Sequence, residues 1–461
     1  MKHFFNFLTI VCIAFLIFQS CSPTTNKTSL PIDQQIPFSE AGSQELKNQW
    51  WKAFNDEQLN LLVDSALAQN FDLAVAYQRL IAANAIVDRE SASFLPTLEG
   101  TARGEISKPQ RAFEDFQQNR SVQIGFSSSY ELDLWGRIKA QVQAQRYIAE
   151  ATRADYQAAA ISIIAEVART WYQLLAANLQ LQIIEDQIST NSKVLNLIKN
   201  RFGGGQIRSV DILRQEQLLK ATREQKYYQE TDIALLENQL QVLLGEEPQN
   251  KINYTEAPLP SLPPMPATGV PVSLVQRRPD VQNAFYQLQA ADRELAAAIS
   301  NKYPRLSINL STTTAQNDTD QIFRNWAYAI GGNLLAPIFY GGELNAEVDR
   351  AEAVKNQRVY NYGQVVLLAF REVEDALVQE KKQIEAVTLI SEQLEISRTA
   401  YKQLQLEYLN GLSDYLDVLV ALDELQQLER DLVNARLTLF EYRIALYRAL
   451  AGNFKFENPD F

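Results

Sequence analysis

The chain has 461 residues, of which 46% are hydrophobic and 21% are charged, and its formal net charge is −12 at pH 7. This composition excludes a disordered chain, and the presence of only one long apolar run excludes a membrane protein with several spanning helices. The negative charge argues against a nucleic-acid partner, because phosphate binding requires a basic surface.

The first predicted element is a secretory signal peptide over residues 1–20. An apolar run from Phe4 to Phe18 follows Lys2, ends in Gln19-Ser20-Cys21, and is short for a spanning helix. A cysteine directly after a small residue resembles the lipobox of bacterial lipoproteins, although Phe18 and Gln19 depart from the usual small aliphatic pair. We therefore predict a lipid anchor at Cys21 and a lipid-anchored segment over 21–49. Ordinary signal cleavage is the alternative.

Removal of this signal limits the chemistry of the mature chain. His3, which is the only histidine, and Cys12 both lie in the removed segment, so Cys21 is the single remaining cysteine. An intrachain disulfide, a histidine-based triad and a histidine metal site are thereby excluded. We expect no enzyme and no cofactor apart from the covalent lipid at Cys21.

The rest of the chain is predicted to contain two copies of one structural repeat, over residues 50–250 and 271–453. Motifs of the first half recur about 205 to 208 residues later and in the same order. Leu134-Trp135-Gly136 returns as Phe339-Tyr340-Gly341, and Val210-Asp211-Ile212-Leu213 returns as Leu416-Asp417-Val418-Leu419. A proline-rich connector over 251–270, which cannot be helical, joins the halves, and a tail over 454–461 follows them.

Four strands are predicted, at about 95–106, 121–133, 304–315 and 325–337. Apolar and polar residues alternate along them, as where Val122, Ile124 and Phe126 alternate with glutamine, glycine and serine. Each strand is long enough to cross a bilayer when tilted, and strands in lipid must close into a barrel of at least about eight. Four strands cannot close, so we expect a trimer with twelve strands or a dimer with eight. Two hairpins on a soluble sheet are the alternative.

Four long helices are predicted, at about 138–202, 208–245, 343–410 and 414–451. The stretch 138–201 contains neither proline nor glycine, so as a helix it would be roughly 95 Å long at the standard rise. The last helix has coiled-coil spacing from Leu425 to Ala449. The fold class is therefore an α+β membrane protein, in which four strands per protomer join a shared barrel continued by a helical coiled-coil barrel. A soluble coiled-coil scaffold is the remote alternative.

Several segments together resemble the TolC/OprM family of outer-membrane efflux proteins, over nearly all of the mature chain. They include Trp50-Trp51, Asn70-Phe71-Asp72-Leu73, Glu131 to Arg137, Arg277-Arg278-Pro279-Asp280, Tyr303-Pro304 and Ala336 to Gly342. The resemblance is to the lipoprotein (NodT-type) branch that serves resistance-nodulation-division (RND) pumps. It implies a homotrimer in the outer membrane that extends into the periplasm, with a periplasmic adaptor, an inner-membrane RND pump, outer-membrane lipid and small-molecule substrates as partners. A type I secretion channel that exports polypeptide is the alternative.

The resemblance also implies a gate at the periplasmic tip, where the helices reverse at Gly203, Gly204 and Gly205 and again at Gly411. Asp417 matches a gate-ring aspartate, so three copies would present facing carboxylates that favour a cation. Asp414 is a second candidate, and a solvated turn carboxylate is the alternative for both. Tyr408 and Asp211 match a pair that hydrogen-bonds across the closed tip. Ser413 stands where a gate arginine is expected, so Arg208 is the candidate substitute.

Overall fold

The computed structural model describes residues 38–40, 42, 49–107, 119–250, 254, 258–268, 277–317 and 322–452. They form two compact units. The first is built mainly from Arg79–Arg153 and Asn283–Gln364, and the second mainly from Ala154–Gln282 and the chain from Val365 onward. Cys21 and the predicted signal peptide lie outside the described residues.

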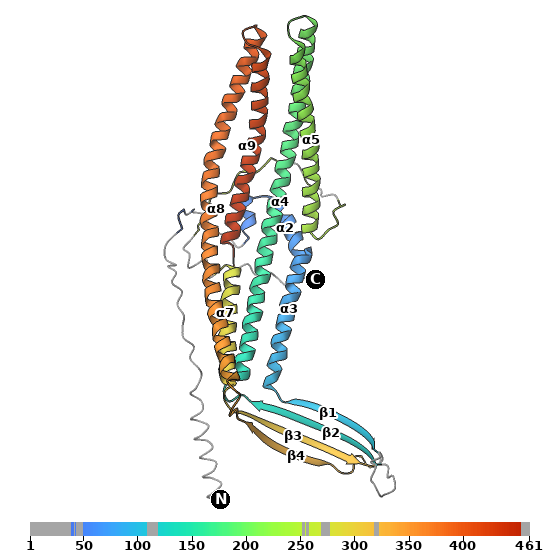
Figure 1. The fold of residues 1–461 in the computed structure, drawn as a ribbon. Helices are drawn as coiled ribbons and strands as arrows, with labels where there is room; N and C mark the ends of the chain where they lie inside the picture. Colours follow the sequence, from blue (N-terminus) through green and yellow to red (C-terminus); the bar gives the residue numbers. More distant parts are fainter. Residues whose placement is uncertain are drawn as a thin grey trace. The chain divides into compact units, whose positions relative to one another are not determined.

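The first unit contains a four-stranded antiparallel sheet in the order β1-β2-β3-β4 (Figure 1). The strands are β1 (Thr97–Ser107), β2 (Asn119–Leu132), β3 (Arg305–Gln316) and β4 (Ala327–Leu335). Each observed strand end lies within two residues of the end predicted from the alternation. Strands from the two halves of the sequence therefore share one sheet, because β2 pairs directly with β3.

The register of the sheet places most of the large apolar side chains of the four strands on one face. Gly100 pairs with Phe126, Phe126 with Thr312, and Thr312 with Tyr328, so every second residue on each strand points the same way. This face carries exposed Leu98, Ile106, Phe126, Ile308, Leu310, Tyr328, Ile330 and Leu334, with Ile330 78% exposed. A contiguous exposed apolar surface of this kind marks an interface with another protein or with lipid.

Trp135 joins the end of β2 to the start of β3 in the first unit. Its indole Nε1 donates to the Pro304 carbonyl oxygen at 2.8 Å, and its ring stacks on Tyr303 with centroids 5.0 Å apart. Asp133 accepts hydrogen bonds from the backbone N–H groups of Ile138 and Lys139, which satisfies the first turn of the following helix. The exit of the chain from the sheet is therefore fixed by an aromatic pair and a helix cap.

Figure 1 shows two long helical hairpins, α4–α5 and α8–α9. The tips and most of the length of these hairpins belong to the second unit. Their helices are α4 (Arg137–Gly203), α5 (Ser209–Leu243), α8 (Glu343–Leu409) and α9 (Tyr415–Leu450). The first helices of the hairpins have 67 residues each, and the second helices have 35 and 36. Shorter helices α2 (Glu57–Gln69), α3 (Phe71–Ser91) and α7 (Pro279–Ser300) accompany them, with short 3-10 turns at Trp50–Phe54 and Ala92–Phe94. Among the described helices, none combines the length and hydropathy of a candidate membrane span.

An aromatic cluster forms the core of the second unit near the C-terminal end of α9. Trp50 stacks on Tyr447 at 5.5 Å, and Phe54 lies 5.3 Å from Tyr172, which in turn lies 4.8 Å from Phe440. These large rings are almost completely buried, so their packing removes a large apolar area from water. The proline-rich residues 258–268 contain no helix, as their composition predicts.

Candidate functional site

The tips of the two hairpins pack against each other through one buried cluster. Ile198 of α4 packs with Tyr415 and Val418 of α9, and partly buried residues of α5 and α8 surround them. Gly203, Gly204 and Gly205 lie at the first reversal and Gly411 at the second. The structure therefore brings the two predicted tip turns into one site.

The carboxylate of Asp211 finds its charge and hydrogen-bond partners inside its own hairpin. Its side chain is 5% exposed and lies 3.5 Å from Arg208 Nη2 and 3.8 Å from Arg214 Nη1. Arg208 is the N-cap residue of α5, and its backbone N–H also donates to Asp211 Oδ2 at 3.3 Å. Among the described residues, Arg208 thus pairs with the start of its own helix, so the structure gives no sign that it bridges to the second hairpin.

The predicted hydrogen bond between Tyr408 and Asp211 is not formed within the chain. The Tyr408 hydroxyl is buried without a hydrogen-bond partner among the described residues, while Arg201 Cζ lies 4.8 Å from the centre of its ring. Tyr415 makes the bond between the hairpins instead, because its hydroxyl donates to Gln215 Oε1 at 2.5 Å. The carboxylate of Asp211 already accepts from Arg208 at the start of α5, which explains why it does not reach across.

Burial keeps Tyr415 in its neutral, hydrogen-donating form. Removal of the phenol from water raises its pKa above the usual value, and the nearby Tyr408, Tyr401 and Asp211 raise it further. The Tyr415 phenol therefore keeps the proton that it donates to Gln215 up to a higher pH than an exposed tyrosine would. This hydrogen bond is a contact between neutral groups, unlike the ion pairs around Asp211.

A buried amide network that the sequence analysis missed lies beside the tip. Asn191 of α4 and Gln426 of α9 exchange two hydrogen bonds, at 3.1 and 3.0 Å. Asn191 also donates to Thr222 at 3.0 Å, and its backbone carbonyl oxygen accepts from Gln215 at 3.0 Å. In the sequence, these polar residues recur at spacings that place them on the apolar side of the long helices. In a single sequence they look like ordinary surface residues of a coiled coil.

Asp414 and Asp417 lie at the exposed start of α9. Asp414 is the N-cap residue but makes no side-chain capping bond, and Asp417 stands in the first turn, where a negative charge is favoured. Both side chains are exposed. The described residues contain no group of three or more histidine, cysteine, aspartate or glutamate side chains that could hold a metal ion.

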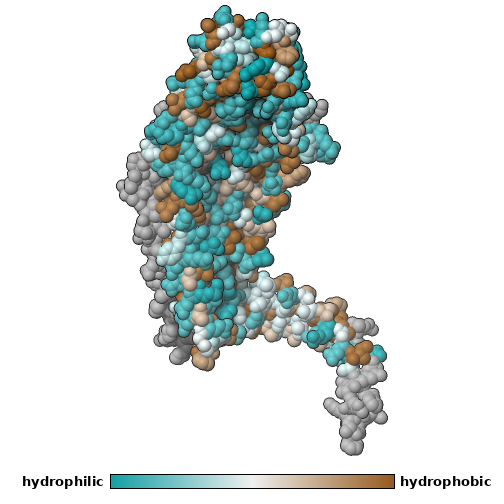
Figure 2. Space-filling model, turned by 45° about the horizontal axis from the view of Figure 1, so that its top comes forward, coloured by the Kyte–Doolittle hydropathy of each residue, from teal (hydrophilic) through white to brown (hydrophobic). Residues whose placement is uncertain are grey.

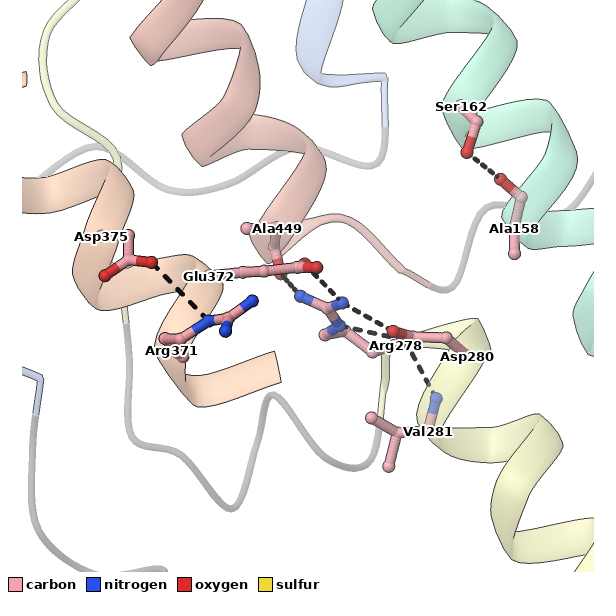
Figure 3. Close-up of polar contacts among 9 residues, drawn as sticks. All are labelled: Ala158, Ser162, Arg278, Asp280, Val281, Arg371, Glu372, Asp375 and Ala449. Carbon is pink, nitrogen blue, oxygen red and sulfur yellow. Dashed lines mark hydrogen bonds and ion pairs between the residues drawn. The ribbon is translucent and has the colours of Figure 1, made fainter. Parts of the chain in front are cut away.

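Arg278 forms a second polar centre at the beginning of α7 (Figure 3). Its guanidinium donates to Asp280 at 2.6 Å, to Glu372 of α8 at 2.8 Å and to the Ala449 carbonyl oxygen at 3.0 Å. One residue of the Arg-Arg-Pro-Asp motif therefore ties α7, α8 and the last turn of α9 together. Arg278 therefore has a structural role, because its partners are two carboxylates, which pair with its charge, and a carbonyl oxygen at the end of a helix.

Comparison with known proteins decides the family. The family model described as "Outer membrane efflux protein" matches residues 62–246 and again residues 270–452. The chain belongs to the outer membrane efflux protein family. The family consists of channel proteins rather than enzymes, and membership makes this chain an outer-membrane channel component of an efflux system that extends into the periplasm.

This outer membrane efflux protein is similar to proteins from Pseudomonas over almost its full length. It is 29% identical to "Pyoverdine export outer membrane protein OpmQ" of Pseudomonas aeruginosa, with 96% of each chain covered. It is 28% identical to "Solvent efflux pump outer membrane protein SrpC" of Pseudomonas putida, covering 97% of this chain and 98% of that one. A solved structure of the outer-membrane channel OprN superimposes with a TM-score of 0.86, at 28% identity, over 94% of this chain and 99% of that chain.

The tip of this efflux protein also carries exposed hydrophobic side chains. Figure 2 shows brown residues scattered among hydrophilic ones at the end where the hairpins reverse. The exposed apolar residues there are Phe202, Leu213, Leu406, Leu409, Leu412, Leu416 and Val420, with Leu412 78% exposed. The end of the hairpins is therefore a surface on which apolar and hydrophilic side chains are mixed.

Proposed function

We propose that this outer membrane efflux protein is the passive exit duct of a tripartite RND-type system. In that system an inner-membrane pump and a periplasmic adaptor deliver small molecules to the helical tip, and the strands conduct them across the outer membrane. The observation that carries the proposal is the two-faced sheet, with an apolar face suited to lipid and a polar face suited to water. The cargoes named for the relatives, pyoverdine and solvent, support small molecules as substrates.

A homotrimer is the assembly that we propose. Four strands per chain do not close a barrel, whereas three copies supply twelve. The first and last strands, β1 and β4, are the two edges of the described sheet and would pair between copies. Mass measurement of the purified protein in detergent tests this arrangement, and a stable dimer would contradict it.

The helices support the same assembly through an internal tandem repeat. Gln187 of α4 is buried against α9, but Gln393, which lies 206 residues later on α8 (393 − 187), is exposed. Asn434 of α9 contacts Gln180, but Tyr228, which lies 206 residues earlier on α5 (434 − 206), is 63% exposed. Helices α4 and α9 thus pack against each other within one chain, whereas the equivalent faces of α8 and α5 are exposed. A neighbouring copy would cover these faces.

We also propose that Cys21 carries the lipid that tethers the N-terminal segment. The support is the sequence pattern around Cys21 alone, since this residue lies outside the described residues. Labelling of cells with a radioactive fatty acid tests it, because an unlabelled mature band would exclude the anchor. A Cys21→Ser variant with a conventional signal should reduce efflux rather than abolish it, because the barrel supplies the membrane attachment.

At the tip, we propose that Asp417 of three copies forms a ring that favours cations, with Asp414 as a less central neighbour. The support is the exposure of both side chains and their place at the start of α9. Single-channel recording tests this role, since Asp417→Ala should remove block by divalent cations while Asp414→Ala should not. Unchanged block in Asp417→Ala would leave both residues as solvated helix-start carboxylates.

The whole proposal is tested by reconstitution and by deletion. The purified protein should form channels in planar lipid bilayers, and cells without it should become sensitive to a panel of toxic small molecules and detergents. Loss of a secreted polypeptide with unchanged drug sensitivity would instead favour a type I secretion channel. Release from membranes by a salt wash would favour a soluble scaffold.

A further inference from the structure

The end of β2 and the start of β3 are held together by one aromatic residue. Trp135 follows β2, and Tyr303 and Pro304 directly precede β3. The Trp135 ring stacks on Tyr303, and its indole Nε1 donates to the Pro304 carbonyl oxygen. A ring that carries a hydrogen-bond donor thus joins two neighbouring strands at this end of the sheet.

An equivalent pair of residues stands before β1, which is one open edge of the described sheet (Figure 1). Leu95-Pro96 precedes β1 as Tyr303-Pro304 precedes β3, 208 residues later (303 − 95). Leu95 is 68% exposed within the chain. The surface that receives Trp135 before β3 therefore has an uncovered counterpart before β1.

An equivalent aromatic residue stands after β4, which is the other open edge. Tyr340 lies directly before Gly341 as Trp135 lies directly before Gly136, and the two glycines have φ values of +59° and +73°. Glycine adopts this left-handed conformation without steric cost, so the chain turns in the same way before α8 as before α4. Tyr340 carries a donor group on its ring, as Trp135 does, but it is 48% exposed.

The strand directions allow these two features to meet between copies. All three strand pairs are antiparallel, so β4 runs opposite to β1 as β2 runs opposite to β3. When β4 of one copy pairs with β1 of the next, the end of β4 lies beside the start of that β1. The end of β2 and the start of β3 have the same relationship within one chain. Tyr340 of one copy is thereby brought to Leu95 and Pro96 of the next.

We propose that Tyr340 of each copy docks on Leu95 and Pro96 of the next copy and closes the boundary between them. The inference rests on the proposed homotrimer, because a closed ring of copies is what brings β4 beside a second β1. The Tyr340 ring covers the Leu95 side chain, and its hydroxyl donates to the Pro96 carbonyl oxygen. The contact removes exposed apolar area from water at each of the three boundaries.

Lipid is the other possible occupant of this surface. Ile338 and Phe339, which precede Tyr340, are 90% and 86% exposed, and such residues suit an apolar surrounding. The counterpart of Tyr340 decides the choice, because Trp135 packs on protein and uses its donor on a backbone carbonyl oxygen. A second copy of this chain offers Tyr340 the same ring surface and the same acceptor.

Site-specific photo-crosslinking of the full chain tests the contact. The photoreactive amino acid p-benzoylphenylalanine replaces Tyr340, and the purified trimer is irradiated and separated on a denaturing gel. We expect bands of linked chains, with the link in the neighbouring copy's tryptic peptide Glu90–Arg103, which contains Leu95 and Pro96. Phe323 is the control position, because it is 71% exposed but precedes β4 at the opposite end of the sheet. The same replacement there should give no link to this peptide.

A link to lipid, or intact trimers without linked chains, would overturn the proposal. If the replacement of Tyr340 prevents assembly, the photoreactive amino acid at Leu95 reverses the test. It should link to the tryptic peptide Asn325–Arg350, which contains Tyr340, and absence of that link is equally contrary to the proposal. If the wild-type protein forms no trimer, the proposed assembly fails rather than this contact.

Removal of the ring should also weaken the trimer. Tyr340→Ala should lower the temperature at which the trimer dissociates in detergent by several degrees, whereas Phe323→Ala should leave it unchanged. Tyr340→Phe keeps the ring and loses only the hydroxyl, so its decrease should be smaller than that of Tyr340→Ala. A wild-type dissociation temperature in Tyr340→Ala would show that this ring does not hold the copies together.

Discussion

Arg443 of α9 donates to both carboxylate oxygens of Glu380 of α8, at 2.7 and 2.5 Å. The two side chains are 3% and 0% exposed, so the pair is sealed from water. The remaining nitrogen of Arg443 donates to the carbonyl oxygens of Pro263 and Pro264. One guanidinium thereby fixes the proline-rich connector against the helix pair of the second half.

Loss of the Glu380 carboxylate should strongly destabilise the second unit. In Glu380→Ala the buried guanidinium keeps its charge without a counterion, which costs about 3–5 kcal/mol in comparable cases. The free energy of unfolding in urea, followed by circular dichroism, measures the effect. Glu385→Gln is the control, because the Lys382–Glu385 pair is exposed and should contribute nothing measurable. Partial recovery in Glu380→Leu/Arg443→Leu would confirm that the unpaired charge causes the loss.

Replacement of Tyr172 by phenylalanine should stabilise the protein. The Tyr172 hydroxyl is fully buried and has no hydrogen-bond partner among the described residues, so its removal should gain about 1 kcal/mol. Thermal unfolding at neutral pH measures this gain. Tyr227→Phe, at a side chain that is 70% exposed, should leave the unfolding temperature unchanged. A loss of stability in Tyr172→Phe would indicate a partner for this hydroxyl.

The same residue predicts a dependence on alkaline pH. Burial, and then the nearby Asp56, raise the pKa of Tyr172 above its usual value. The folded state therefore holds this proton more tightly than the unfolded state does. The contribution of this difference in proton binding to the free energy of unfolding is fully present below about pH 10, the usual tyrosine pKa. It declines as the pH rises above that value. Tyr172→Phe should show a shallower decline in unfolding free energy above pH 10, and identical slopes would argue against the assignment.

The glycines of the first tip turn should differ in their tolerance of substitution. Gly205 has φ +70° and open space around it, so Gly205→Ala should cost about 1 kcal/mol through backbone strain alone. Gly203 is the last residue of α4 and has no positive φ, so Gly203→Ala should be neutral or stabilising. Unfolding free energies of the two variants provide the comparison. Equal costs would show that the positive φ of Gly205 does not determine the cost of its substitution.

Trp135 should determine how firmly β3 is held at its start. Trp135→Phe keeps an aromatic ring beside Tyr303 but loses the hydrogen bond to Pro304, at an expected cost of about 1 kcal/mol. Amide hydrogen exchange should accelerate in the first residues of β3. Phe323→Leu is a suitable control, because Phe323 is 71% exposed and should leave that exchange unchanged.

The strands and long helices could be predicted because their periodicities are written in consecutive residues. The alternation through Val122, Ile124 and Phe126 required no knowledge of the partner strand, and its ends were located to within two residues. The contacts at the tip could not be predicted in this way. Tyr408 and Tyr415 are both aromatic and lie on opposite sides of a turn, so only the geometry of residues 410–414 decides which of them reaches α5.

The amide network was hidden for a related reason. Asn191 and Gln426 are 235 residues apart, and each alone looks like a solvent-facing position on a long helix. Their burial follows from which hairpin packs on which, which is a property of the tertiary fold. The roles of Asp417 and Cys21 remain predictions, since the first depends on three copies and the second lies outside the described residues.

The open edges of the sheet have a consequence for how the protein is made. Within the described residues, β1 and β4 each have a neighbour on one side only, so a newly secreted copy presents two strand edges and an apolar face to water. Such edges pair readily with other unfolded chains. The yield of membrane-inserted protein should therefore depend on the rate of synthesis: slow expression would favour membrane insertion, and rapid expression would favour aggregates.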